Sequence, residues 1–270
     1  MMEEKQLLKA TENPQEEQFF ASLHSSASAA LLLDYDGTLA PFRAERGQAF
    51  PYPGVTPLIN KIIGNGRTRV VMVTGRDANE IVPLLGVMPH PEIWGSQGLQ
   101  RLRTNGTYEM PRLDRSVQQA LTEAEAWLRR QDLFGTAECK PGGIAVHWRG
   151  LPPETTSDIR RRTLLGWLPL TERFPVVVLP FDGGLEIRSP CRNKGDAVRT
   201  ILAEMGEHAP VAYLGDDQMD EDAFRALQDR GLTVLVRSEW RETFADLWVR
   251  PPAELLEFLS RWLKACSGPQ

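Results

Sequence analysis

The residues best suited to chemistry in this chain of 270 residues are aspartates that directly follow short apolar runs. Asp34 and Asp36 follow residues 29–33, and a second acidic group begins at Asp216, directly after the Val-Ala-Tyr-Leu-Gly run. A carboxylate can attack phosphorus as a nucleophile. A second carboxylate two residues along the same turn can first donate and then accept the proton that such a reaction needs. The spacing of Asp34 and Asp36 is therefore compatible with phosphoryl transfer.

These acidic residues would repel one another if the fold brought them to one place, because like charges at close range raise each other's pKa or require a cation. One lysine, Lys194, is too little positive charge to compensate them. Several carboxylates with a backbone oxygen suit a hard cation such as Mg²⁺, which also keeps water or phosphate oxygens as ligands. The residue types therefore predict a magnesium site in this cluster. Its members are Asp34, Asp36, Asp216, Asp217 and Asp220.

Strand and helix patterns alternate in the first hundred residues and again after Pro190, which is typical of a parallel α/β sheet. Ligands of such sheets bind at the carboxyl ends of the strands, where Thr74-Gly75-Arg76 also falls. Strands are predicted at 29–33, 70–73, 92–94, 211–214 and 232–236. Helices are predicted at 16–23, 55–64, 77–85, 195–205, 220–227 and 254–265.

The middle of the chain has a different pattern, with helices at 113–130 and 155–165 and strand-like stretches at 136–148 and 175–187. Asp182-Gly183-Gly184 within the last stretch is a hairpin signal. We therefore predict an α/β core interrupted by a small α+β unit. The core would comprise residues 1–106 and 189–270, and the inserted unit would comprise residues 107–188.

Composition narrows the possible partners. Hydrophobic residues make up 41% of the chain, enough for a globular core, and the net charge of -5 lacks the basic footprint of a nucleic-acid-binding protein. The start Met-Met-Glu-Glu-Lys-Gln does not resemble a signal peptide, and no apolar run approaches the roughly 18 residues that span a bilayer. We expect a cytoplasmic monomer that acts on a small molecule and binds neither nucleic acid nor membrane.

Four segments together resemble the motifs of haloacid-dehalogenase-type (HAD) phosphohydrolases, in the same order. They are Asp34–Leu39, Thr74-Gly75-Arg76, Lys194, and Gly215–Glu221. This resemblance implies a Rossmann-like parallel-sheet core with an inserted α+β cap, and a phosphatase that requires Mg²⁺.

The resemblance narrows to the trehalose-6-phosphate phosphatase subfamily, which carries Leu-Asp-Tyr-Asp-Gly-Thr-Leu at the first motif and Gly-Asp-Asp-x-Thr-Asp-Glu at the fourth. Residues 33–39 match the first, and the fourth matches with Met219 in place of Thr. The subfamily's Glu-x-Lys strand is matched by Glu138-Cys139-Lys140, its His-aromatic-Arg element by residues 147–149, and its later cap glutamate by Glu186. The expected reaction is hydrolysis of trehalose 6-phosphate, in trehalose biosynthesis.

The resemblance also implies a role for each residue. Asp34 is the expected nucleophile and Asp36 the acid and base, while Thr74 and Lys194 hold phosphoryl oxygens. Mg²⁺ is expected on the Asp34 carboxylate, the Asp36 carbonyl and Asp216. Asp217 and Asp220 are expected to orient waters and Lys194. The expected substrate-binding residues are Arg76, Gln97, Glu138, Lys140 and Glu186.

Besides Met219, two positions depart from the subfamily: Gln97 stands where it often has His, and Gln100 where an acidic residue is common. Both bear on the preferred sugar, so sucrose 6-phosphate and a glycosyl 3-phosphoglycerate remain alternative substrates. A phosphomutase is disfavoured because the segment after the first motif, residues 40–57, is too short for a helical cap. A non-catalytic sugar-phosphate sensor is a further alternative, although such a protein would be free to lose Asp34 or Lys194.

Overall fold

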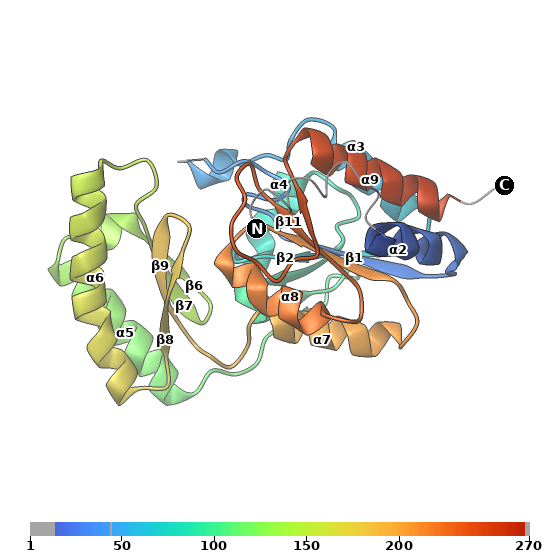
Figure 1. The fold of residues 1–270 in the computed structure, drawn as a ribbon. Helices are drawn as coiled ribbons and strands as arrows, with labels where there is room; N and C mark the ends of the chain where they lie inside the picture. The colour runs from blue at the N-terminus through green and yellow to red at the C-terminus, as the bar shows by residue number, and fades with distance from the viewer. Residues whose placement is uncertain (1–13, 44, 268–270) are drawn as a thin grey trace.

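The computed structural model describes residues 14–43 and 45–267. Its chain forms two lobes, one built around a mostly parallel sheet and the other around a small antiparallel sheet (Figure 1). Within the described residues the larger sheet has eight strands in the order β12-β11-β10-β1-β2-β3-β4-β5. These are β1 (Ala29–Leu33), β2 (Thr68–Val73), β3 (Glu92–Gly95), β4 (Gln100–Leu102), β5 (Tyr108–Glu109), β10 (Val211–Gly215), β11 (Leu232–Val236) and β12 (Leu247–Val249).

The centre of the larger sheet is formed by apolar strands that are buried on both faces, as expected for parallel strands covered by helices. β1 pairs in parallel with β2 and with β10. Leu33 at its end lies opposite Met72 on one side and Leu214 on the other. The three strands therefore end at one edge of the sheet, and the polar residues that follow them lie there together.

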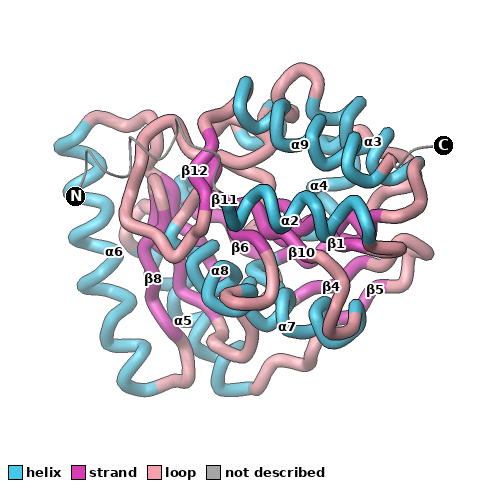
Figure 2. The backbone as a smooth tube through the Cα atoms, turned by 45° about the vertical axis from the view of Figure 1, so that its right-hand side comes forward, coloured by secondary structure: helices cyan, strands magenta, loops and turns pink. Residues whose placement is uncertain are grey.

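Helices cover both faces of this sheet (Figure 2). One apolar core joins the sheet to α2, α3, α4 and α9, and a second joins its other face to α7 and α8. The predicted α/β architecture is therefore confirmed. The helices of this lobe are α2 (Pro14–Ser25), α3 (Val55–Gly64), α4 (Ala78–Leu85), α7 (Lys194–Met205), α8 (Glu221–Leu227) and α9 (Ala253–Cys266).

The second lobe occupies the chain between β5 and α7 and has an apolar core of its own. Its four strands are antiparallel in the order β6-β7-β9-β8, and α5 and α6 pack against one face of the sheet (Figure 1). The elements are α5 (Arg115–Arg130), β6 (Ala137–Lys140), β7 (Gly143–His147), α6 (Pro153–Arg173), β8 (Val177–Phe181) and β9 (Gly184–Arg188). Single helical turns lie at Arg46–Gln48, Ser96–Gly98, Phe134–Thr136 and Gln218–Asp220.

Several elements differ from the sequence-based expectation. α6 continues eight residues beyond the predicted end at Leu165, and β4, β5 and β12 were not predicted. The last three are strands of two or three residues at or near the sheet edges, too short to show an apolar period. Among the helices described, none is both long enough and apolar enough to cross a membrane.

Candidate active site

Asp34 lies directly after β1 and its side chain is almost fully buried. The Lys194 ammonium, at the first turn of α7, lies 2.8 Å from Asp34 Oδ1 and 2.7 Å from Asp220 Oδ1. Asn193 and Asp196 form a capping box that fixes the start of α7. The lysine is thereby held between two carboxylates.

Asp220 is fixed by hydrogen bonds to both of its oxygens. Oδ1 accepts from Lys194 and from the Tyr213 hydroxyl at 2.6 Å, and Oδ2 accepts from the backbone N–H groups of Asp216 and Asp217 at 3.0 Å. These bonds close the turn after β10 onto the single helical turn that follows it. Asp220 therefore shapes the loop that presents Asp216 and anchors Lys194.

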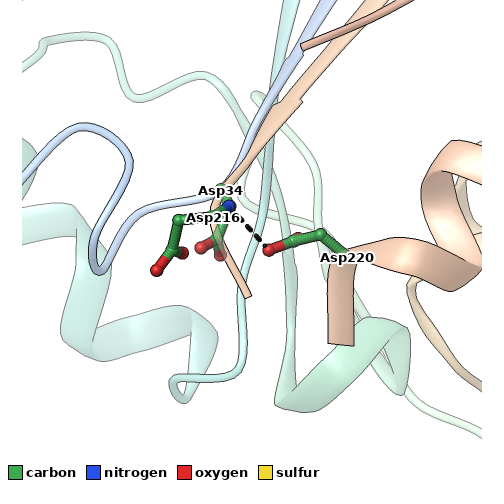
Figure 3. A group of neighbouring side chains, drawn as sticks. All are labelled: Asp34, Asp216 and Asp220. Carbon is green, nitrogen blue, oxygen red and sulfur yellow. Dashed lines mark hydrogen bonds between the residues drawn. The ribbon is translucent and has the colours of Figure 1, made fainter. Parts of the chain in front are cut away.

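Asp216 lies beside Asp34 and donates its backbone N–H to Asp220 (Figure 3). Both of its carboxylate oxygens are buried, and neither has a hydrogen-bond partner among the residues described. Gly37 allows this approach: it has a φ of +83°, and a Cβ there would lie 2.1 Å from Asp216 Oδ2. One oxygen from each of Asp34, Asp216 and Asp220 lies within 4.8 Å of the others.

The electrostatics of this group fit a cation. Burial raises the pKa of Asp34 to about 7 even though Lys194 opposes the shift. Burial, together with Asp34 and Asp220, raises the pKa of Asp216 well above its usual range. A buried carboxylate with two unpartnered oxygens costs free energy unless a cation or proton compensates it. Since Asp220 is already fully engaged, Asp34 and Asp216 are the carboxylates with capacity for Mg²⁺.

Asp36 differs from Asp216 because both oxygens of its carboxylate accept hydrogen bonds from Arg76 in a bidentate pair. Arg76 Nε donates to Asp36 Oδ2 and Arg76 Nη2 donates to Oδ1, both at 2.6 Å. Arg76 Nη1 also donates to the carbonyl of Arg46 at 2.9 Å. The guanidinium is buried, whereas the Asp36 side chain remains 27% exposed and accessible to a ligand.

The loop after β2 is tied to the loop after β3. The Thr74 hydroxyl accepts from the Arg76 N–H at 3.2 Å, and the Thr74 carbonyl accepts from the Gln97 N–H at 3.0 Å. Ser96 and Gln97 both have positive φ, which non-glycine residues rarely adopt. Gln97 is buried, and its Oε1 has no hydrogen-bond partner in the described structure. Strain and an unpaired polar atom at one residue are typical of a ligand site.

Gln100 has a structural environment instead. Its Oε1 accepts from the Ala78 N–H and from the Ser96 hydroxyl, each at 3.0 Å. Its Nε2 donates to Asp77 Oδ2 at 2.7 Å and to the Tyr108 hydroxyl at 3.0 Å. All of its polar groups are therefore engaged in fixing the start of α4 and the loop after β3.

The inserted unit contributes three predicted residues from β6 and β9, the two strands that flank β7. Lys140 on β6 lies 2.7 Å from Glu186 Oε1 on β9 and donates to the carbonyl of Gly75 at 2.9 Å. Glu138 on β6 pairs with Arg46 and lies 3.0 Å from His147 Nε2. Glu138 Oε1 and Glu186 Oε2 are buried and lack a hydrogen-bond partner within residues 14–43 and 45–267. Lys140 and Glu186 line a cavity shared with Ser96.

Some residues of the site were not predicted. Asp217 accepts from the N–H of Asp182, in the turn between β8 and β9, at 2.9 Å. Arg241 donates to the carbonyls of Asp216 and Asp217 at 3.2 and 2.7 Å. Asp182 and Arg241, like Arg46 and Tyr213, lie outside the four motifs, so the motifs could not identify them as site residues.

Comparisons with known proteins agree with this geometry. Residues 32–245 match the sequence model of the trehalose-phosphatase family. A trehalose-phosphate phosphatase of Mycobacterium marinum is 28% identical over an alignment of 250 positions that covers 86% of this chain. This chain spans 60% of the length of that relative and of its counterpart from Mycobacterium bovis.

Two solved structures of Candida albicans share the fold. The C-terminal domain of its trehalose-6-phosphate phosphatase has a TM-score of 0.80 at 18% identity, covering 94% of this chain and 98% of that chain. The C-terminal domain of its trehalose synthase regulatory protein has a TM-score of 0.69 at 14% identity, covering 92% and 97%. At these identities the likeness concerns the fold alone.

Proposed function

This chain belongs to the trehalose-phosphatase family, and we propose that it hydrolyses trehalose 6-phosphate to trehalose and phosphate. The family match, which extends over most of the chain, supports a phosphatase. The charge and spacing of the carboxylates after β1 and β10 support phosphoryl transfer. We further propose that the protein is a cytoplasmic monomer and that its small-molecule partner is a sugar phosphate.

One observation carries the choice of a polar, hydroxyl-rich substrate. Buried oxygens of Gln97, Glu138 and Glu186 have no hydrogen-bond partner among the residues described. An unpaired buried polar atom costs about 1–3 kcal/mol, so such atoms are retained where a ligand pairs them. A disaccharide can donate its hydroxyl groups to these acceptors. A ligand without those hydroxyl groups would leave them unpaired, which is the basis of strong discrimination.

The proposed reaction has two steps. An oxygen of Asp34 attacks phosphorus, the bond from phosphorus to the sugar oxygen breaks, and Asp36 donates a proton to that leaving oxygen. Asp36 then removes a proton from water, the water oxygen attacks phosphorus, and the bond to Asp34 breaks to release phosphate. Thr74 and Lys194 would hold phosphoryl oxygens during both steps.

Asp34, Asp216 and the carbonyl of Asp36 are the proposed ligands of Mg²⁺. The unpartnered oxygens of Asp216 support this assignment, as does the buried cluster that it forms with Asp34 and Asp220. A bound Mg²⁺ would neutralise charge on the transferring phosphoryl group. Asp217 and Asp220 would then act by orienting the Asp216 loop and Lys194.

Release of phosphate from a panel of sugar phosphates tests this proposal. The panel comprises trehalose 6-phosphate, sucrose 6-phosphate, glucose 6-phosphate and glucosyl 3-phosphoglycerate, each with Mg²⁺ or with a chelator. We expect Mg²⁺-dependent release from trehalose 6-phosphate, with a loss of at least about 10³-fold in Asp34→Asn, because the nucleophile is removed. Faster release from another sugar phosphate would show that the proposed substrate is wrong, while the proposed phosphatase reaction would stand. Binding of trehalose 6-phosphate without any release would favour a sensor.

A further inference from the structure

The turn between β8 and β9 reaches from the inserted unit to the edge of the larger sheet. Its Asp182 donates through the backbone N–H to Asp217 Oδ2 at 2.9 Å. The Asp182 carboxylate accepts from Arg237 Nη2, directly after β11, at 3.1 Å. Arg237 Nη1 lies 4.0 Å from Asp216 Oδ2. Asp182 thereby connects the inserted unit to two of the loops that build the site.

A second group braces the same turn. Arg149, which follows β7, donates to the carbonyl of Asp182 and lies 3.6 Å from its carboxylate. The Arg149 guanidinium carbon lies 3.5 Å from the ring centroid of Phe42, in the loop after Asp36. A cation over an aromatic face is attractive, more so when water is partly excluded. The turn is therefore held to the larger lobe at three loops, those after β10, β11 and β1.

These contacts differ from those that Glu138 and Lys140 make with the larger lobe. Both of these residues belong to the proposed sugar-binding set, so a bound sugar would replace some of their present partners. Asp182 and Arg237, in contrast, contact each other and the loops after β10 and β11, and neither belongs to the proposed sugar-binding set. The contacts of the turn can therefore persist when substrate is bound.

We propose that Asp182 and Arg237 are positioning residues whose ion pair holds the inserted unit closed over Asp34. This rests on the proposed function, because closure matters only for a substrate that the inserted unit must bind. Closure excludes water and completes a site assembled from two lobes. A small phosphate ester can reach Asp34 without contacting the inserted unit, so closure should not raise its rate of hydrolysis. The pair therefore sets the preference for a large sugar phosphate.

The test compares trehalose 6-phosphate with p-nitrophenyl phosphate as substrates for Asp182→Ala. We expect kcat/KM for trehalose 6-phosphate to fall about tenfold, equivalent to about 1.4 kcal/mol, mainly through KM. Turnover of p-nitrophenyl phosphate should stay within about twofold. Asp158→Ala is the matched control, because Asp158 pairs only with Arg161 and Arg162 of its own helix among the ion pairs described. It should leave both substrates unchanged.

A double-mutant cycle tests whether Asp182 acts through its ion pair with Arg237. Arg237→Ala should reduce kcat/KM for trehalose 6-phosphate as well, and combining it with Asp182→Ala should cost less than the sum of the two losses. Additive losses, an unchanged KM in Asp182→Ala, or an equal loss with both substrates would overturn the proposal.

Small-angle X-ray scattering separates this proposal from the proposed function. Without substrate, Asp182→Ala should have a larger radius of gyration than the wild type, and Asp158→Ala should not. If the wild type failed to cleave trehalose 6-phosphate, the proposed function would fall, and this comparison alone would decide whether the turn holds the lobes together. An unchanged radius of gyration would exclude that role.

Discussion

Asp36 and Asp216 lie at the same edge of the sheet but in opposite surroundings. Asp36 is held by two short hydrogen bonds from Arg76, whereas both oxygens of Asp216 lack a hydrogen-bond partner in the part of the chain described. A proton carrier benefits from a fixed orientation. A metal ligand needs free lone pairs instead. The difference between these two carboxylates therefore matches the different roles proposed for them.

Replacing Arg76 with lysine should test the value of that fixed orientation. Lysine keeps the charge but cannot form the bidentate pair with Asp36. We expect kcat for trehalose 6-phosphate to fall roughly 10–100-fold, since small misplacements of a catalytic group have effects of this size. Arg103→Lys is the matched control, because Arg103 pairs with Glu109 on the exposed surface. Equal kcat values for the two variants would contradict this expectation.

Asp216→Asn should change how the protein responds to Mg²⁺. Without the metal, removing an uncompensated buried charge should stabilise the fold by about 1 kcal/mol, or raise Tm by roughly 2–4 °C. With the metal, the wild type should gain stability and the variant should not, because binding to the folded state drives the gain. Thermal melting with Mg²⁺ or a chelator measures both effects, and Asp222→Asn, at a partly exposed carboxylate 3.3 Å from Arg225, is the control. A Mg²⁺-induced rise in Tm that survives in Asp216→Asn would count against the assignment.

Residue types and their order along the chain are sufficient to identify the aspartates, Lys194 and the strand ends that carry them. They are insufficient for Arg46 and Asp182, whose contacts are made across the two lobes. Arg46 stands beside no motif and Asp182 is marked only as part of a hairpin turn, while Glu138 and Asp217, which they contact, are more than thirty positions away in the chain. Such contacts depend on how the lobes are placed, which no local pattern records.

At the scale of elements, α7 is tied to the sheet by a carboxylate at its far end. Glu204 accepts from Arg101 on β4 through both oxygens, at 2.8 and 2.7 Å, and from Arg69 on β2 at 2.6 Å. Glu92 joins the same network through both arginines. Because Lys194 lies at the start of α7, this network helps to fix the helix that carries it.

The network predicts a pH dependence. Hydrogen bonds from Arg101, and then from Arg69, lower the pKa of Glu204 to about 2 against the effect of burial. The folded-state pKa is below the unfolded value of about 4.3, so the stabilisation is present above that pH and is lost as pH falls toward 2. Glu204→Gln should therefore destabilise the protein at pH 7, and the difference from wild type should shrink below pH 4. Chemical denaturation at several pH values measures this, and a constant difference would refute it.

α6 shows where a sequence pattern fails at this scale. The prediction ended the helix at Leu165, before Gly166 and Pro169, which are residues that usually interrupt helices. In the structure Gly166 packs against α5, and a Cβ there would lie 2.1 Å from the Trp127 ring. Gly166 therefore allows α5 and α6 to pack closely. The sequence of α6 alone does not reveal this role, because it depends on the position of α5.

At the scale of the whole molecule, each lobe has its own apolar core. Leu128→Ala in the inserted unit and Leu259→Ala in α9 each remove a fully buried side chain, at a cost of about 2–5 kcal/mol. We expect Leu128→Ala to speed hydrogen exchange in residues 115–188 and to leave the strands of the larger sheet protected. Leu259→Ala should do the reverse. Exchange that accelerates equally in both lobes would show that they unfold as one cooperative unit.

The inserted lobe also has a consequence for how the gene can vary. Its helices and strands occupy one uninterrupted stretch, 115–188, whereas the larger sheet is assembled from strands on both sides of that stretch. A single recombination event that replaced this stretch could therefore exchange the proposed sugar-binding residues Glu138, Lys140 and Glu186 while leaving Gln97 and the proposed catalytic aspartates in place. A change of substrate could then arise from one replacement of DNA. The incoming segment would have to keep a turn that fits Asp217 and Arg237 of the larger lobe, as the turn at Asp182 does.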